Sequence, residues 1–81
     1  MSGKFLGKAI KEFREKKNIT QEELALKSDV SVSSISKIEN GNNDNPLLET
    51  ICNIAEGLEV SVLELYKLAE KIRKGEEGIH I

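Results

Sequence analysis

Apolar residues recur three and four positions apart along most of the chain, the spacing of one face of an α-helix. In the first such stretch, about residues 4–17, that face carries Leu6, Ala9, Ile10 and Phe13. The pattern continues to residue 74 and predicts five helices and no strand. We expect the second helix over about residues 21–28, the third over 32–40 and the fifth from 62 to about 74. The fourth should start at Pro46 and carry Leu47, Leu48, Ile51, Ile54 and Ala55.

Three of the predicted helices begin with the same polar signal. Thr20 and Ser61 each precede a glutamate by three residues, at Glu23 and Glu64, which is the spacing of a capping box. Ser31 offers a third cap, because its hydroxyl can accept a hydrogen bond from an N–H group of the first turn. These signals place three helix starts at about residues 21, 32 and 62.

The second and third predicted helices are separated only by Ser28, Asp29 and Val30. So short a turn forces the helices to cross steeply, as in a helix-turn-helix, whose second helix enters the major groove of DNA. Gly41 marks the end of that second helix, since glycine adopts a left-handed backbone without steric cost. The pair therefore predicts DNA binding through the helix that follows Ser31.

From about Leu6 to Tyr66 the chain resembles the Cro and phage-repressor type of helix-turn-helix domain, also called the xenobiotic-response-element family. The segments that carry the resemblance as a set are Ile19–Ala25, Val30–Ser31, Ile35–Gly41, Leu48–Thr50, Ile54–Ala55 and Val60–Val62. It implies an all-α, five-helix lambda-repressor-like bundle with its helix-turn-helix at helices 2 and 3. It also implies that the third helix reads double-stranded DNA.

The third helix presents short polar side chains and one lysine outward, because Ile35 and Ile38 face the core. Lys37 can reach guanine acceptors or a phosphate, and Val32 a thymine methyl group. By the resemblance, Gln21 contacts the DNA backbone and steadies this recognition helix. The predicted DNA-binding residues are Gln21, Ser31, Val32, Ser33, Ser36, Lys37, Asn40, Asn42 and Asn43. For the serines and asparagines the alternative is simple solvation of a helix surface and a loop.

The resemblance also pairs Arg14 with Glu39, in a partly buried salt bridge that braces the first helix against the third. At two positions the chain departs from the family. Asp29 and Glu59 stand where relatives usually have turn glycines. Asp tolerates the left-handed region better than most residues, so we expect the first of these turns to be strained but to form.

The net charge of −2 argues weakly against a nucleic-acid partner, but the charge is unevenly distributed. Residues 1–45 hold eight Lys/Arg and seven Asp/Glu, whereas residues 46–81 hold four and seven. The acidic half is therefore remote from the recognition helix. Because that helix has one cation and Asp44 follows it, we expect weak DNA binding by a monomer and useful affinity only from a dimer.

The composition argues against catalysis and cofactors. With Cys52 and His80 as the only cysteine and histidine, the chain has no metal-ligand set and no Cys/His or Ser/His/Asp nucleophile. We therefore expect no cofactor and no enzyme activity. A single cysteine fits a reducing cytosol, and we expect Cys52 to be buried. No apolar run is long enough to span a membrane, so we expect a cytoplasmic protein.

The last predicted helix extends beyond the usual end of the family's domain. Its apolar stripe favours a homodimer interface formed by Leu65, Tyr66, Leu68, Ala69 and Ile72. The alternative is that this helix folds back on the first helix. We expect residues 1–74 to form one DNA-binding domain with a C-terminal dimerisation helix, and residues 75–81 to be a flexible tail.

These features favour a sequence-specific transcriptional regulator, most simply a homodimeric repressor that binds a palindromic operator. A different hypothesis is an antitoxin, which binds its toxin as well as its own operator. A third is a protein-interaction module that has lost DNA binding, for which the low positive charge speaks. A second regulatory protein or a toxin is therefore an alternative partner. The operator, the regulated genes and the sign of regulation do not follow from the sequence.

Overall fold

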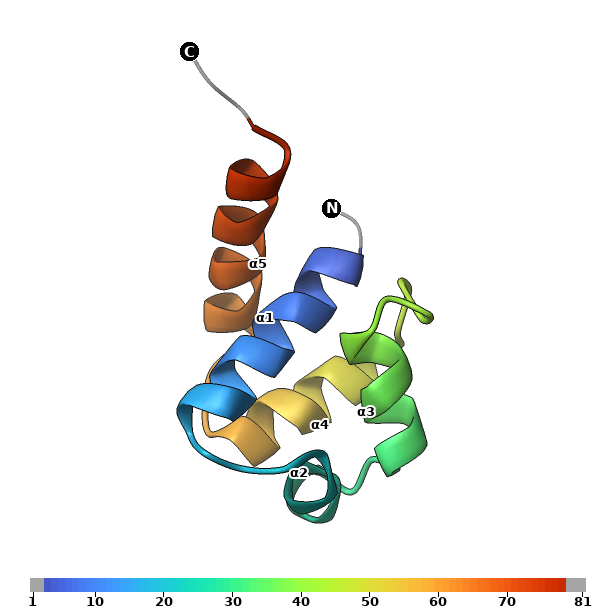
Figure 1. Ribbon diagram of the computed structural model, residues 1–81. Coiled ribbons are helices and arrows are strands. Elements are labelled where there is room, and N and C mark those ends of the chain that lie inside the picture. Colours follow the sequence, from blue (N-terminus) through green and yellow to red (C-terminus); the bar gives the residue numbers. More distant parts are fainter. Residues whose placement is uncertain (1–2, 79–81) are drawn as a thin grey trace.

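Five α-helices account for most of residues 3–78, the part of the chain that the computed structural model describes. They are α1 (Gly3–Lys16), α2 (Gln21–Ser28), α3 (Val32–Glu39), α4 (Leu48–Leu58) and α5 (Val62–Glu76). The described residues contain no strand, so the predicted all-α bundle of five helices is confirmed (Figure 1). None of these helices has the length and hydropathy of a membrane span.

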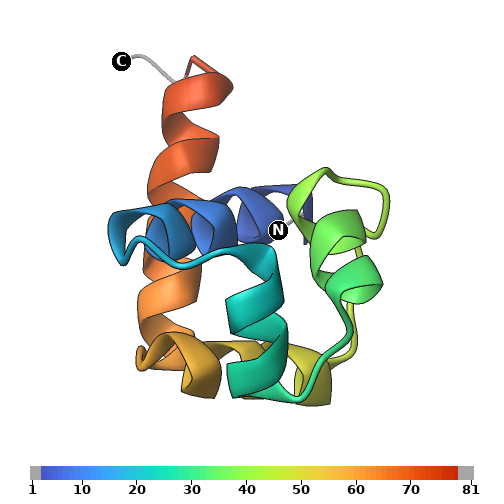
Figure 2. The same cartoon turned by 60° about the horizontal axis from the view of Figure 1, so that its bottom comes forward.

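The helices are arranged around α1, with α5 on one side of the molecule and α3 on the other (Figures 1 and 2). α1 packs on both of them, and α2 packs mainly on α4. Their buried side chains form one apolar core: Phe5, Leu6, Ala9, Ile10, Leu24, Ile35, Ile38, Ile51, Ile54, Ala55, Leu58, Leu65 and Ala69. The helical spacing of apolar residues thus identifies most of this core correctly.

The three predicted N-cap residues begin their helices, but of the two predicted capping boxes the described residues complete only the one at Thr20. Thr20 accepts a hydrogen bond from Glu23 N at 3.0 Å, and Glu23 Oε1 accepts one from Thr20 N at 3.0 Å, which completes a capping box. Ser31 accepts from Ser34 N at 3.1 Å. Ser61 accepts from Glu64 N at 3.0 Å. These bonds satisfy N–H groups that have no partner within a helix, and so they fix where each helix starts.

Three residues that carry side chains end helices in the left-handed backbone region. Asn18, Asp29 and Glu59 have φ values of 56°, 56° and 59°. The turn expected at Asp29 therefore forms without glycine, and its neighbour Val30 closes it by donating to Ala25 O at 3.3 Å. Gly41 has φ 85° after α3, as predicted.

Several predicted boundaries and burials are wrong. Pro46 does not begin α4: Leu47 is the N-cap residue, with φ −63° and ψ 145°. Leu47 and Leu48 are 74% and 65% exposed, and Cys52 is exposed rather than buried. The cause is that Leu48 and Cys52, four residues apart, lie on a flank of α4 that no other helix of the described chain covers.

The predicted tail is also shorter than expected, since α5 continues to Glu76. Two ion pairs support its last turn: Lys8 Nζ to Glu76 Oε2 at 2.6 Å, and Arg73 Nη1 to Glu77 Oε1 at 2.6 Å. Gly75 and Glu76 therefore belong to the helix, while residues 79–81 lie outside the described range. The contact between Lys8 and Glu76 also shows that α5 folds back along α1.

Two glycines let α1 approach α3 and its following loop at backbone distance. A Cβ atom at Gly7 would overlap the carbonyl oxygen of Ile38, and one at Gly3 would overlap that of Asp44. Because these neighbours are backbone atoms, they cannot move aside as the end of a flexible side chain can. The glycines therefore fix how closely the first helix packs against the helix-turn-helix.

This close approach predicts opposite effects for two glycine substitutions. Gly7→Ala should lower the free energy of unfolding by about 2–3 kcal/mol, because the added methyl group overpacks the contact with Ile38. Gly75→Ala is the matched control, since nothing lies within 4 Å of its added Cβ atom. It should raise stability by about 0.5 kcal/mol through helix propensity. Urea denaturation followed by circular dichroism measures the free energy of unfolding of both variants. An increase in both would contradict the close packing of α1 against α3.

Candidate nucleic-acid interface

The recognition helix α3 is held by two buried side chains on its inner face. Ile35 and Ile38 are 0% and 1% exposed. Five of the nine predicted DNA-binding residues share its outer surface. Val32, Ser33, Lys37 and Asn40 are exposed there, and Ser36 is half-buried. The predicted division of α3 into an inner and an outer face is therefore confirmed.

Ser31 has a more structural role than the other predicted site residues. Its hydroxyl accepts from Ser34 N at 3.1 Å and also donates to Ser34 Oγ at 2.9 Å. Both its donor and one of its acceptor positions are thus engaged in starting α3. A DNA contact by Ser31 would have to use its remaining lone pair or replace the bond to Ser34.

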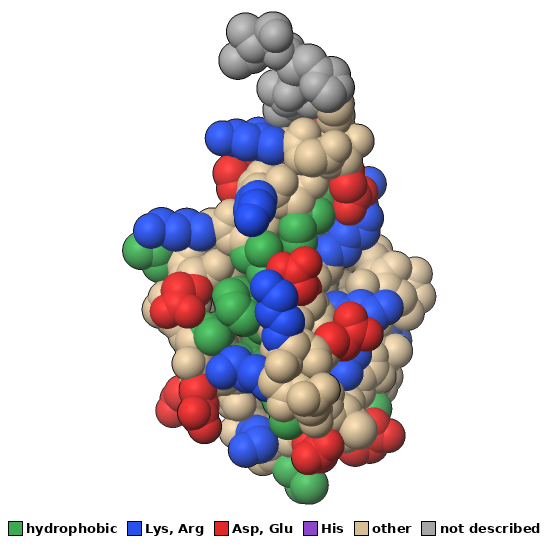
Figure 3. Space-filling view, turned by 60° about the vertical axis from the view of Figure 1, so that its left-hand side comes forward, with side chains coloured by type: hydrophobic (Ala, Val, Ile, Leu, Met, Phe, Trp, Pro, Cys, Tyr) green, Lys and Arg blue, Asp and Glu red, His purple; other side chains and the backbone are tan. Residues whose placement is uncertain are grey.

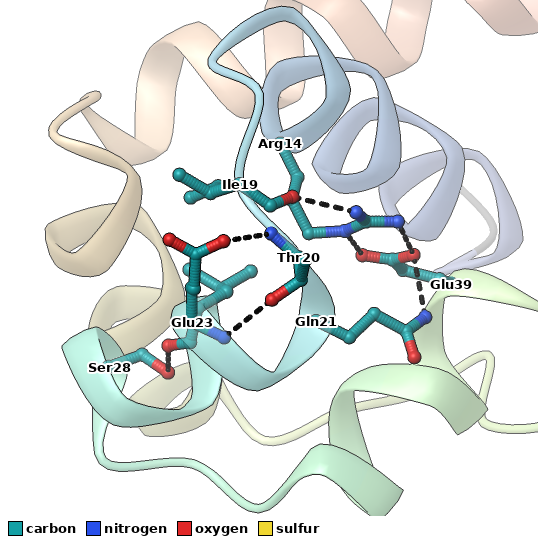
Figure 4. Close-up of polar contacts among 8 residues, drawn as sticks. Arg14, Ile19, Thr20, Gln21, Glu23, Ser28 and Glu39 are labelled. Atoms are coloured by element: carbon teal, nitrogen blue, oxygen red, sulfur yellow. Dashed lines mark hydrogen bonds and ion pairs between the residues drawn. The ribbon is translucent and has the colours of Figure 1, made fainter.

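Arg14, Glu39 and Gln21 form a polar bridge that joins α1, α3 and α2 (Figure 4). Arg14 Nε donates to Glu39 Oε2 at 2.8 Å, and Arg14 Nη2 donates to Glu39 Oε1 at 2.9 Å. Gln21 Nε2 donates to the same Oε1 at 3.0 Å, and Arg14 Nη1 donates to Ile19 O at 2.9 Å. The two charged side chains are 11% and 3% exposed, so the predicted partly buried salt bridge is confirmed.

The hydrogen bond from Glu39 raises the pKa of Arg14 above its ordinary value, although burial opposes the shift. The guanidinium is therefore charged at any pH at which the protein folds. A paired, two-bond contact of this kind fixes orientation as well as distance. The bridge thus holds the start of α2 and the end of α3 at one defined separation.

The loop after α3 uses its asparagines locally. Asn40 Oδ1 accepts from Asn42 N at 2.9 Å, and Asn43 Oδ1 accepts from Asn45 N at 3.1 Å. Asn43 N in turn donates to Lys37 O at 3.0 Å and closes the end of the helix. Because the carbonyl oxygens are the engaged atoms, the amide NH2 groups of Asn40 and Asn43 are the parts available to a phosphate oxygen.

The predicted dimer residues on α5 divide into buried and accessible ones. Leu65 and Ala69 are both 0% exposed inside the core, so their prediction as interface residues is wrong: they face α1 within the same chain. Leu68 and Ile72 are half-buried against that core. Tyr66 is 38% exposed and Leu63, which was not predicted, is 62% exposed. Figure 3 shows apolar side chains gathered among charged ones on the α5 side of the molecule.

Two features near the recognition helix were missed in the sequence. An apolar groove of about 630 Å³ lies between α2 and the start of α3, beside Leu26, which is 87% exposed. Lys11 of α1 lies beside Ser36 and Asn40 of α3. The only signal for Lys11 was its position one helical turn before Arg14. No group of acidic, histidine or cysteine side chains suited to a metal ion occurs among the residues described.

A family model for helix-turn-helix domains matches residues 10–65. The chain belongs to the helix-turn-helix family. It is 37% identical over 76 residues to the transcriptional regulator SlrR of Bacillus subtilis, covering 89% of this chain and 50% of that protein. It is 39% identical over 54 residues to the transcriptional repressor RghR of the same organism, covering 67% of this chain and 40% of the repressor.

Solved structures agree with that assignment. The restriction-modification controller protein C.AhdI from Aeromonas hydrophila superposes with a TM-score of 0.73 at 30% identity, over 78% of this chain and 94% of the controller. The chain spans about half the length or less of the curated relatives named above. Together these matches support a DNA-binding transcriptional regulator.

The polar bridge predicts an asymmetric response to mutation. Arg14→Met should lower the free energy of unfolding by about 3 kcal/mol, because it leaves the Glu39 carboxylate buried without its counter-charge. The double variant Arg14→Met/Glu39→Leu should recover most of that loss. Lys16→Met is the control, since it removes an exposed pair with Glu12 at 3.7 Å and should cost less than about 0.5 kcal/mol. Chemical denaturation decides, and a double variant no more stable than the single one would contradict this account.

Proposed function

We propose that the protein is a sequence-specific repressor that binds a palindromic operator as a homodimer, with α3 of each protomer in the major groove. The observation that carries the proposal is the exposed outer face of α3 on a helix-turn-helix braced by the Arg14–Glu39–Gln21 bridge. A rigid recognition helix with free side chains can select base edges without first ordering itself. In this role the protein acts in the cytoplasm, where its DNA is.

The residues of the site divide between bases and backbone. Lys37, Ser33 and Ser36 bind base edges or adjacent phosphates, while Val32 contacts a thymine methyl group. The amide groups of Asn42 and Asn43 bind phosphate, as does the start of α2 at Gln21, where helix N–H groups lack internal partners. Contacts to phosphate fix the register of α3 on the duplex, and contacts to bases select the operator. The residues proposed to contact the DNA backbone are Gln21, Asn40, Asn42 and Asn43.

The dimer is proposed to form through the exposed part of α5. Leu63 and Tyr66 offer its accessible apolar surface, flanked by Leu68 and Ile72. In such a dimer, joined along α5, a palindromic operator requires the two recognition helices to lie about one turn of DNA apart, roughly 34 Å. Doubling the phosphate contacts compensates for the low positive charge of each protomer.

An antitoxin is a second candidate, and the apolar groove beside Leu26 favours it. Leu26 lines this groove and is 87% exposed, so it offers an apolar contact to a partner protein. A toxin or a second regulatory protein would provide that cover. A neighbouring gene for a small toxin, together with a stable complex of the two purified proteins, would favour the antitoxin over the stand-alone repressor.

The proposed division between base and backbone contacts predicts two kinds of binding defect. Lys37→Ala and Ser33→Ala should each weaken operator binding by about 1–3 kcal/mol, and they should weaken binding to a scrambled duplex less than that. Gln21→Ala keeps the N–H groups of α2 but removes the hydrogen bond to Glu39 that holds the start of α2 against α3, so it should weaken binding to both duplexes alike. Lys27→Ala, on α2 beside Asn53 of α4, is the matched control and should bind like the parent protein. Titrations against an operator obtained by binding-site selection measure these effects. Parental affinity in all three site variants would show that α3 does not read the DNA.

The proposed interface predicts the effect of charge on assembly. Leu63→Asp and Tyr66→Asp should each give a folded monomer with severely reduced operator affinity, because a buried carboxylate destabilises an apolar contact. Ile72 is a poorer test, since it packs on the core of its own chain. Leu26→Asp changes a leucine that is also exposed but lies on α2, and this variant should remain dimeric. Sedimentation of all variants decides: a parent protein that is monomeric at high micromolar concentration excludes this interface.

A further inference from the structure

A notch of about 190 Å³ lies where α1, α2 and α3 meet. It is lined by Lys11, Arg14, Gln21, Ser36, Glu39 and Asn40. At liquid density this volume holds about six water molecules, so it has room for the one phosphorus and four oxygens of a phosphate group. Ser36 and Asn40 belong to the outer surface of α3, and the notch therefore opens on the side of the molecule that faces DNA in the proposed function.

The close packing of α1 brings Lys11 to this notch. The backbone of Gly7 touches that of Ile38, and Lys11 follows Gly7 by one helical turn on the same side of α1. Its side chain consequently lies beside the last turn of α3. Lys11 is exposed, and within residues 3–78 no carboxylate lies in ion-pair contact with it.

The charges around the notch leave Lys11 as its uncompensated cation. Arg14 is neutralised by Glu39 through two hydrogen bonds. Asn40 engages its carbonyl oxygen with Asn42 N, which leaves its amide NH2 group as a donor. Gln21 adds the first N–H group of α2. A cation and neutral donors from three helices thus surround one small space, the combination that phosphate binding requires.

We propose that Lys11 is a DNA-phosphate ligand, and that one backbone phosphate of each half-site occupies this notch between Lys11, Asn40 and the start of α2. The assignment rests on the proposed function. It gives α1 a direct contact with DNA in addition to its role in the core. Because the contact is to the backbone, it contributes to affinity for every sequence and to the register of α3, but not to the choice of base.

The salt dependence of binding tests this assignment. For Lys11→Gln, the slope of log affinity against log salt should fall by about 1 per protomer, on operator and scrambled duplex alike. Between 50 and 200 mM salt the parent protein should then lose about four-fold more affinity per protomer than the variant. Lys11→Arg should keep the parental slope. Lys27→Gln is the matched control with the same change of net charge, and it should also keep the parental slope.

A second measurement locates the contact on the DNA. Neutral methylphosphonate groups replace the operator phosphates one at a time. At one position in each half-site this replacement should lower the affinity of the parent protein but not that of Lys11→Gln. Equal slopes for parent and Lys11→Gln would overturn the assignment and leave the proposed function intact. A loss of affinity spread evenly over all positions would overturn the proposal that one phosphate occupies the notch, because Lys11 would then act only through net charge. A parent protein that binds operator and scrambled duplex equally well would overturn the proposed function alone, and one that binds neither duplex would overturn both proposals.

Discussion

The carboxylate of Glu39 is the constraint on which the helix-turn-helix depends. It lies at the end of α3 with a side chain 3% exposed, and a buried carboxylate is tolerated only with a counter-charge and hydrogen bonds. Arg14 supplies the charge from α1 and Gln21 supplies a further donor from α2. Arg14 also binds Ile19 O, so the connection between the first two helices is tied to the same group. One ion pair and its neighbours therefore link three helices that also share the apolar core.

The local part of the fold follows from the sequence because its causes are local. A cap needs only a hydroxyl and an N–H group within three residues, and the starts of α2, α3 and α5 were predicted from such pairs. Burial of α4 and α5 was less accurate, since it depends on what other helices cover. Periodicity shows that Cys52 and Leu65 lie near an apolar stripe, but not that α1 covers Leu65 while nothing covers Cys52 in the described chain.

The candidate site shows the same division. The outer face of α3 was predictable, because Ile35 and Ile38 fix its register and leave the remaining positions outward. The link from Gln21 to Glu39 and the place of Lys11 were not, since each joins positions eighteen or more residues apart. The pairing of Arg14 with Glu39 came from the family resemblance rather than from the residues themselves. Contacts between residues that are distant in the sequence can be predicted only from a known relative or observed in a structure.

The left-handed residues at two helix ends bear on how long the protein persists in a cell. Asp29 and Glu59 hold a backbone conformation that costs a residue with a side chain about 1 kcal/mol more than glycine. Together they raise the unfolded fraction roughly 30-fold above that of a chain with glycine at both positions. Proteases act on the unfolded fraction, so such a chain is degraded faster. For a regulator whose occupancy of DNA follows its own concentration, faster turnover shortens the delay between the end of synthesis and the release of the operator.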